Sequence, residues 1–252
     1  MNRSKSYLVV VIVLGAVVYL APRSSFGQVT SPSPEGGATV VGRPTTPTAR
    51  PHNFAKWERD IAAFEQADLA NSPPKGAVLF VGASTFTIWK SLPQDFPDHR
   101  IINRAFGGSE IVDSTHFADR IIFPYEPKMI FLRSGSNEIH NGKTPNEVLA
   151  DFQMFVAKVR SKLPEVPIVY VSLNAIPSRW SEKEKDDEAN TLIREAIEKT
   201  LHTRFLDISD MVLTSDGKSR TELFGPDRLH FNQAGYKLLA ERARPFLPTI
   251  TK

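Results

Sequence analysis

Five residues in four polar segments are of the types that carry out acyl transfer. They are Ser84, Gly108, Asn137 and the pair Asp227 and His230. A serine hydroxyl becomes a nucleophile when a histidine takes its proton, and a carboxylate can hold that histidine in place. Backbone N–H groups near a glycine, or an asparagine amide, can stabilise the negative charge that develops on a carbonyl oxygen. The sequence therefore contains each group that such a reaction needs.

Each segment also has a simpler interpretation when it is taken alone. Ser84 could only cap a helix, and Gly108 could only provide the backbone angles of a loop. Asn137 could bond its own backbone in a turn, and Gly225-Pro226-Asp227 could be a turn beside a surface histidine. For Asp227 and His230, the spacing of three residues predicts that both side chains lie on one side of a helical turn. The functional interpretation depends on the segments lying together.

Five short apolar runs predict the strands that would bring them together. They are rich in Val, Ile, Leu and Phe, as strands covered on both faces are, and they span 77–82, 100–103, 128–134, 168–173 and 204–208. Amphipathic helices alternate with them, which predicts one parallel sheet between two helical layers, an α/β/α sandwich.

Helix starts are marked at several positions. Asn53 is a favourable N-cap for the first helix, and the final helix is expected to follow Asn232. The segments 144–147 and 181–184 both have capping-box spacing, with Pro145 at the first helical position of the former. In α/β folds of this kind the ligand site lies beyond the carboxyl ends of the strands. The polar segments above fall there, so they are expected to meet at one rim of the sheet.

The order of these segments resembles that of the SGNH (GDSL-like) hydrolase family, whose four blocks supply a serine, a glycine, an asparagine and a histidine with a nearby aspartate. The segments 80–84 and 178–180, with Trp89, are similar to those of bacterial relatives of platelet-activating-factor acetylhydrolase. The similarity runs from about residue 53 to residue 247. It implies a flavodoxin-like SGNH hydrolase fold with a five-stranded parallel sheet.

The resemblance also implies the roles of the site residues. Ser84, His230 and Asp227 would be the catalytic triad, and the N–H groups of Ser84 and Gly108 with the Asn137 amide would form the oxyanion hole. Two positions depart from the family pattern: Ala83 stands where aspartate is usual, and Glu138 follows Asn137 where aspartate is usual. Glu138 could shift the Asn137 loop and weaken the oxyanion hole.

The N-terminal part predicts export. Residues 1–27 have a basic start, an apolar run and a small-residue site, which is typical of a signal peptide; the alternative is a retained membrane anchor. Residues 28–52 are rich in Pro, Ser and Thr and are interpreted as a linker, and residues 53–252 as the hydrolase domain. The expected location is periplasmic or extracellular, with membrane contact only through the N-terminal segment if it is uncleaved.

Composition excludes several partners. The chain has no cysteine, so no disulfide or thiolate metal site is expected. Without three basic residues of the signal, 28 basic residues balance 28 acidic ones, which gives no electrostatic reason to expect nucleic acid as a partner. The other histidines lack metal-ligand spacing, and His140 is interpreted as a loop residue at the edge of the cleft. We expect no metal and no cofactor.

The expected function is an exported serine esterase acting on short acyl groups, acetyl above all, of a small-molecule or glycan ester. Two alternatives remain: an acyltransferase acting on a glycan, and a catalytically silent glycan-binding module. The sequence leaves the oligomeric state open. Five further side chains could line the cleft or be ordinary core and surface residues: Trp89, Arg104, Arg133, Arg179 and Trp180.

Overall fold

A computed structural model describes residues 52–249 of the chain. The predicted signal or anchor and the predicted linker up to residue 51 lie outside the described residues. No helix within 52–249 is both long enough and apolar enough to cross a lipid bilayer.

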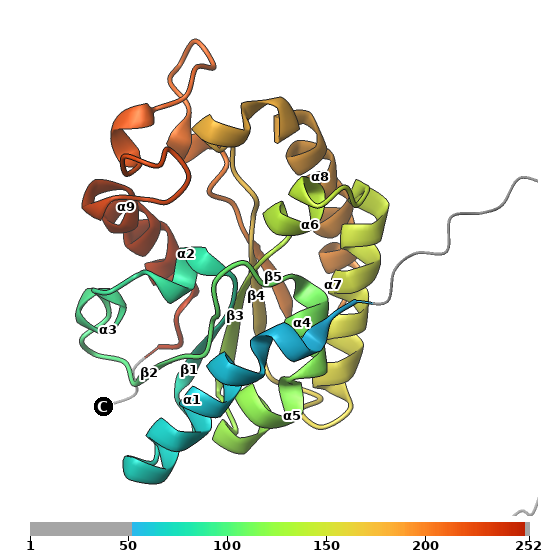
Figure 1. Cartoon of the computed structure of the whole chain (residues 1–252), viewed down its shortest axis with the longest axis vertical. Helices are drawn as coiled ribbons and strands as arrows, with labels where there is room; N and C mark the ends of the chain where they lie inside the picture. Colours follow the sequence, from blue (N-terminus) through green and yellow to red (C-terminus); the bar gives the residue numbers. More distant parts are fainter. Residues whose placement is uncertain (1–51, 250–252) are drawn as a thin grey trace, which may run out of the picture. The chain divides into compact units, whose positions relative to one another are not determined.

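The five predicted strands form one parallel sheet (Figure 1). Their order across the sheet is β2-β1-β3-β4-β5, and every neighbouring pair is parallel. The strands are β1 Val78–Gly82, β2 Ile101–Asn103, β3 Met129–Arg133, β4 Ile168–Val171 and β5 Thr203–Leu206. The predicted fold class is confirmed, and each strand lies within the run that predicted it or within one residue of it.

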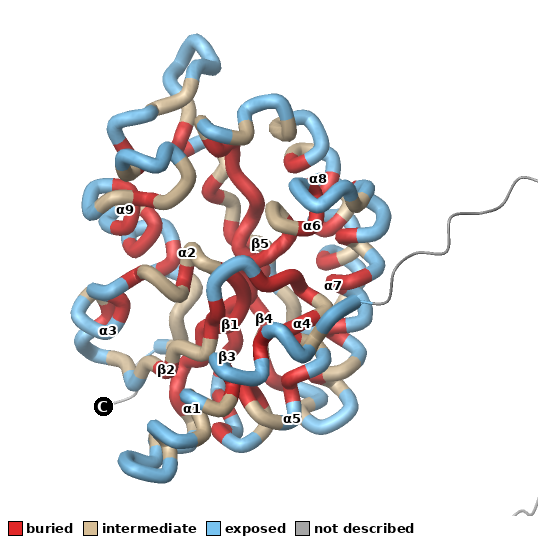
Figure 2. The backbone as a smooth tube through the Cα atoms, viewed as in Figure 1, coloured by how far each residue is buried: buried red, intermediate tan, exposed pale blue. Residues whose placement is uncertain are grey.

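Two hydrophobic clusters lie on opposite faces of the sheet and make the three layers. Alternate residues of β1 point to opposite clusters, so that Leu79 lies in one and Phe80 in the other. The first cluster is covered by α1 Glu58–Ala70, α4 Ile111–His116, α5 Ala118–Ile121, α6 Ser136–His140, α7 Pro145–Arg160 and α8 Lys183–Glu198. The second is covered by α2 Ser84–Thr87, α3 Leu92–Asp95 and α9 Gln233–Ala243. Strands β1, β3 and β4 are therefore buried on both faces (Figure 2).

Three of the predicted helix starts are confirmed, two of them with their capping bonds, and one is wrong. Thr144 and Glu147 make the reciprocal capping box of α7, and the Asn232 side chain caps α9. Asn53 makes no capping hydrogen bond, because the chain enters a 3₁₀ turn, Phe54–Trp57, before α1. The capping box predicted at 181–184 is absent. Ser181 lies inside the 3₁₀ helix Pro177–Glu182, which runs directly into α8, so it cannot act as an N-cap.

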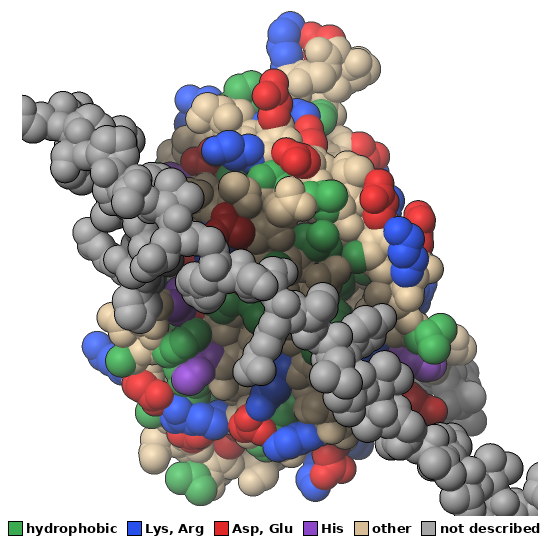
Figure 3. Space-filling view, turned by 90° about the vertical axis from the view of Figure 1, so that its right-hand side faces the viewer, with side chains coloured by type: hydrophobic (Ala, Val, Ile, Leu, Met, Phe, Trp, Pro, Cys, Tyr) green, Lys and Arg blue, Asp and Glu red, His purple; other side chains and the backbone are tan. Residues whose placement is uncertain are grey.

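The strand order places a topological switch at the centre of the sheet. From β1 the chain moves to the neighbour on one side, β2, and then returns to the other side, β3. The two crossovers diverge at the carboxyl ends of β1 and β3, which leaves a crevice where open α/β sheets bind ligands. On the face shown in Figure 3, acidic and basic side chains of the described residues are interspersed.

Candidate active site

Ser84 lies at the carboxyl end of β1, at the switch point. Gly82 ends the strand with φ of 123°, and a Cβ there would lie 2.2 Å from the Arg133 carbonyl oxygen, so the turn requires glycine. The Ala83 N–H then bonds the same carbonyl at 2.9 Å. As the first residue of α2, Ser84 has a backbone N–H with no acceptor inside its own helix. The hydroxyl and this N–H are both presented at the edge of the sheet.

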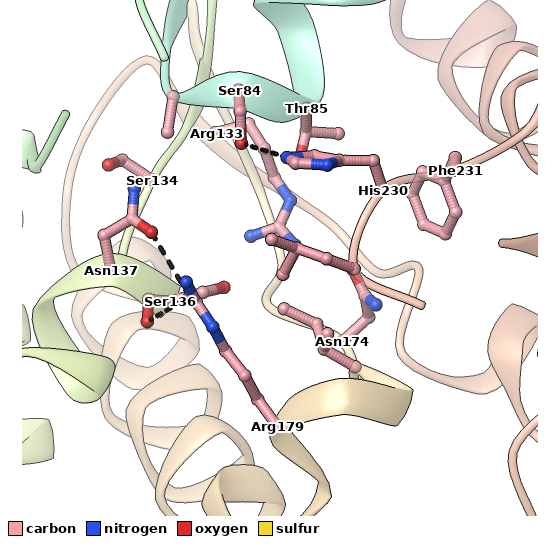
Figure 4. A pocket seen from close by; sticks show the side chains of 13 residues that line it. Ser84, Thr85, Arg133, Ser134, Ser136, Asn137, Asn174, Arg179, His230 and Phe231 are labelled. Atoms are coloured by element: carbon pink, nitrogen blue, oxygen red, sulfur yellow. Dashed lines mark hydrogen bonds between the residues drawn. The ribbon is translucent and has the colours of Figure 1, made fainter. Parts of the chain in front are cut away.

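His230 connects the serine to Asp227. Its Nε2 lies 2.9 Å from Ser84 Oγ, and its Nδ1 lies 2.6 Å from Asp227 Oδ2. The imidazole is mostly buried, with 24% of its side chain exposed, whereas half of the Asp227 side chain is exposed. Figure 4 shows His230 pointing at Ser84 from the loop before α9. Of the three side chains proposed from the sequence as a triad, His230 lies within hydrogen-bonding distance of both others.

The Asp227–His230 segment is a tight turn, so the predicted helical geometry is wrong. Arg228 adopts a left-handed φ of 54°, which breaks the helical path. Asp227 Oδ1 instead accepts hydrogen bonds from the N–H groups of Leu229 and His230, at 3.0 and 3.1 Å. These bonds, together with that to the imidazole, lower the pKa of Asp227 to about 2. The carboxylate is therefore ionised at every pH at which a histidine can act as base.

Asn137, at the start of α6, reaches across to the loop after β2. Its Nδ2 donates to the Ser109 carbonyl at 2.9 Å, and its Oδ1 accepts from Arg179 Nη1 at 3.2 Å. The amide orientation is thus fixed from both ends, and one N–H of Nδ2 remains for a ligand. Asn137 does not bond its own turn, which was the simpler interpretation.

Gly108 lies in the β2–α4 loop with φ of 75°, a conformation that favours glycine. It is exposed, and it is not among the residues that line the pocket around Ser84. The adjacent Ser109 carbonyl is the one that anchors Asn137. The role of the Gly108 N–H in an oxyanion hole stays a prediction.

Comparison with known proteins decides the family. The profile of the GDSL-like lipase/acylhydrolase family matches residues 77–238, which include every site residue named above. The chain belongs to this family. The resemblance recognised in the sequence is confirmed, and membership makes the protein a carboxylic ester hydrolase.

Solved structures share the fold of this GDSL-like hydrolase. A Streptococcus pneumoniae protein provisionally named a platelet activating factor has 20% identity and a TM-score of 0.68, covering 77% of this chain and 94% of its own. A GDSL-like lipase from Bacteroides thetaiotaomicron has 15% identity and a TM-score of 0.63, covering 77% and 98%. An acetylxylan esterase from Geobacillus stearothermophilus has 15% identity and a TM-score of 0.55, covering 68% and 94%. No curated protein matches the chain.

Glu138, which departs from the family pattern, anchors the two loops of the site to each other. Its carboxyl group is fully buried, and Oε1 accepts the N–H of Ile111 at 2.6 Å, at the start of α4. The Asn137 side chain beside it keeps its bond to Ser109. Burial raises the pKa of Glu138 to about 7. Glutamate is one methylene longer than aspartate, and this length lets its carboxyl group bond the backbone of the neighbouring loop.

This raised pKa predicts a pH-dependent stability. Because the folded-state pKa exceeds the ordinary value, stability is greatest when Glu138 is protonated and falls as pH rises through about 7. Glu138→Gln keeps an acceptor for the Ile111 N–H but cannot ionise. We expect its free energy of unfolding to fall by about 1–3 kcal/mol less than that of the wild type between pH 5 and pH 8. Urea unfolding across this range measures the difference.

Burial also raises the pKa of Asp186 to about 7, so the Glu138→Gln variant should keep some dependence of stability on pH. Asp186→Asn should remove this remainder. An unchanged slope of unfolding free energy against pH in both variants would contradict the assignment.

Of the five other side chains considered, two line the pocket. Arg133 and Arg179 lie beside Ser84, whereas Trp89 is buried and stacks on Tyr236 at 5.2 Å. Arg104 pairs with Asp68, and Trp180 lines a separate hollow.

Two outcomes differ from the sequence interpretation of single residues. His140 ends α6 and pairs with Glu182 at 2.7 Å, so it is a helical residue rather than a loop residue. Asn174, which lines the pocket, was missed, although it follows the carboxyl end of β4 and the strand-end rule applied to it. Within 52–249, no group of three or more histidine, aspartate or glutamate side chains is placed to hold a metal ion.

Proposed function

We propose that the protein is an exported serine esterase that removes short acyl groups, acetyl above all, from carboxylic esters through a Ser-His-Asp acyl-enzyme mechanism. The observation that carries the proposal is the chain of contacts from Ser84 Oγ through His230 to Asp227, at 2.9 and 2.6 Å. These separations match the nucleophile, base and orienting carboxylate of a hydrolytic triad. The N-terminal basic and apolar segment supports export.

The proposed reaction has two steps. His230 Nε2 takes the proton of Ser84 as Oγ attacks the ester carbonyl carbon, and the resulting imidazolium returns a proton to the departing alcohol oxygen. This leaves an acyl group on Ser84. Water then gives a proton to His230 and attacks the acyl carbon, and the carboxylic acid leaves as Ser84 recovers its proton.

Negative charge on the carbonyl oxygen needs donors that are already in place. The Ser84 N–H and the Asn137 amide are positioned by α2 and by the contacts with Ser109 and Arg179. With the predicted contribution of the Gly108 N–H, they would form the oxyanion hole. An amide held in this way also argues against a silent binding module in which Glu138 displaces Asn137 and opens the oxyanion hole.

The size of the pocket supports a short acyl group. Its volume is about 40 Å³, which suits a group of a few heavy atoms. The lining is largely polar, with serine, asparagine and arginine side chains beside the triad. The Geobacillus neighbour, an acetylxylan esterase, makes an acetylated glycan a reasonable natural substrate to test first.

Acyl chain length tests this proposal. We expect kcat/KM to fall at least about 10-fold from p-nitrophenyl acetate to the octanoate, because the small pocket beside Ser84 offers a long chain little apolar surface. Release of p-nitrophenol measures it. Equal or rising values for octanoate would contradict a short-acyl specificity, and acetylated product appearing when a sugar acceptor is added would favour the acyltransferase alternative.

A further inference from the structure

Two arginine side chains line the pocket that also contains Ser84 and His230. Arg133 ends β3 and only 3% of it is exposed, and Arg179 comes from the 3₁₀ helix Pro177–Glu182. Figure 4 shows Arg133 extending into the pocket from beside Ser84 toward Asn174, and Arg179 entering from the opposite side and reaching Asn137 and Ser136. The chemistry of Ser84 therefore takes place next to two positive charges.

Neither guanidinium group is paired with a carboxylate. Arg133 Nη2 donates to Asn174 Oδ1 at 2.7 Å, and its buried Nε has no partner. Arg179 Nη1 donates to Asn137 Oδ1 and to the Ser136 carbonyl. All these acceptors are neutral, and within residues 52–249 no carboxylate oxygen lies within 4.0 Å of either group. Burying a cation without an anionic partner is costly, so such a pocket favours an anion.

The nearest acidic side chains compensate this charge only in part. Asp186 and Glu138 both act on Arg133 through space, and burial raises the pKa of each to about 7. Below about pH 7, both carboxyl groups are therefore mostly protonated. The two tyrosines that face Arg133, Tyr170 and Tyr236, carry uncharged hydroxyls, because burial raises the pKa of each. The residues that line the pocket include no aspartate or glutamate.

We propose that the ester cleaved at Ser84 carries a carboxylate close to its scissile bond, and that Arg133 and Arg179 bind this carboxylate. The inference rests on the proposed function and specifies its substrate class. The carboxylate belongs either to the acyl part, as in a dicarboxylic half-ester, or to the alcohol part, as in an acetylated acidic sugar. Arginine suits either source, because its planar donors match the two carboxylate oxygens.

Matched ester pairs test the proposal on the wild-type protein. For the acyl side, monomethyl succinate is compared with methyl succinamate, which replaces the carboxylate by an amide of the same shape. For the alcohol side, O-acetylglycolate is compared with O-acetylglycolamide. We expect the carboxylate member to have a kcat/KM at least about 10-fold higher in one pair, and that pair identifies the source. Equal values in both pairs, or a preference for both amides, would overturn the proposal.

Variants connect the preference to the arginines. Arg133→Gln and Arg179→Gln should each lower the carboxylate-to-amide ratio, and Arg133→Lys should restore part of it because the charge returns. Arg242→Gln is the matched control, since Arg242 is an exposed α9 residue paired with Asp210. A ratio unchanged by both glutamine variants, with both members of a pair losing activity equally, would show that the arginines serve the fold or the reaction in general.

Binding without turnover separates this inference from the proposed function. Calorimetric titration of Ser84→Ala with monomethyl succinate, O-acetylglycolate and their amides does not depend on hydrolysis, nor on whether Arg133→Gln folds. Carboxylate-specific binding with no turnover of any ester by the wild type would uphold the binding of a carboxylate by the two arginines and overturn the esterase proposal. Turnover of neutral esters with no carboxylate-specific binding would uphold the esterase proposal and overturn the inference about the carboxylate.

Discussion

Ser84→Ala should lower kcat for p-nitrophenyl acetate by about 10⁴–10⁶-fold, the scale seen when a serine hydrolase loses its nucleophile. Alanine removes only Oγ, the atom that lies 2.9 Å from His230 Nε2. The backbone N–H of residue 84 and the Asn137 amide remain, so weak residual catalysis by water is expected. Steady-state kinetics measures the loss, and thermal unfolding checks that the fold is retained.

The control for this variant is another serine-to-alanine change outside the site. Ser161 is exposed at the C-terminal end of α7, where its hydroxyl bonds the Lys158 carbonyl, and Ser161→Ala should keep the wild-type rate. A fluorophosphonate should label the wild type at Ser84 and should not label Ser84→Ala. Equal turnover by wild type and Ser84→Ala would exclude Ser84 as nucleophile, and no turnover by either would favour the silent glycan-binding alternative.

The strands could be predicted because burial on both faces leaves a distinctive pattern. β1 and β3 are buried at every residue and apolar throughout except for Arg133 at the end of β3, and few other structures suit a run of that kind. Once the sheet is parallel, residues after different strands must share one rim. The sequence could therefore predict, without any distances, that Ser84 and Asn137 lie at the same site.

Features set by loop geometry could not be predicted in this way. Arg228 adopts a left-handed conformation that its residue type does not require, so the sequence favoured a helical turn where the chain makes a tight loop. The contact between Arg179 and Asn137 depends on how the segment after β4 folds back over α6. The direction of the Glu138 carboxyl group depends on where the Ile111 N–H lies, which is a property of the packed loops.

Asp227→Asn should lower kcat by about 10²–10⁴-fold with little change in KM, because the carboxylate selects the useful tautomer of His230. Asp227 Oδ2 accepts the proton on Nδ1, which leaves Nε2 free to take the proton of Ser84. An asparagine amide facing Nδ1 would donate instead and place the imidazole proton on Nε2, where it blocks that transfer. The lower bound allows for water, since half of the Asp227 side chain is exposed.

The pH dependence separates this explanation from a general loss of structure. With a pKa of about 2, Asp227 stays ionised throughout the working range, so its own protonation does not shape the acidic limb of the wild-type kcat profile. The asparagine variant should lose rate even on the plateau above that limb, because its defect is the tautomer rather than protonation. Asp210→Asn, which breaks only the exposed pair with Arg242, should keep the wild-type profile. A plateau within threefold of wild type in Asp227→Asn would mean that the turn alone, through the Leu229 and His230 N–H groups, orients the histidine.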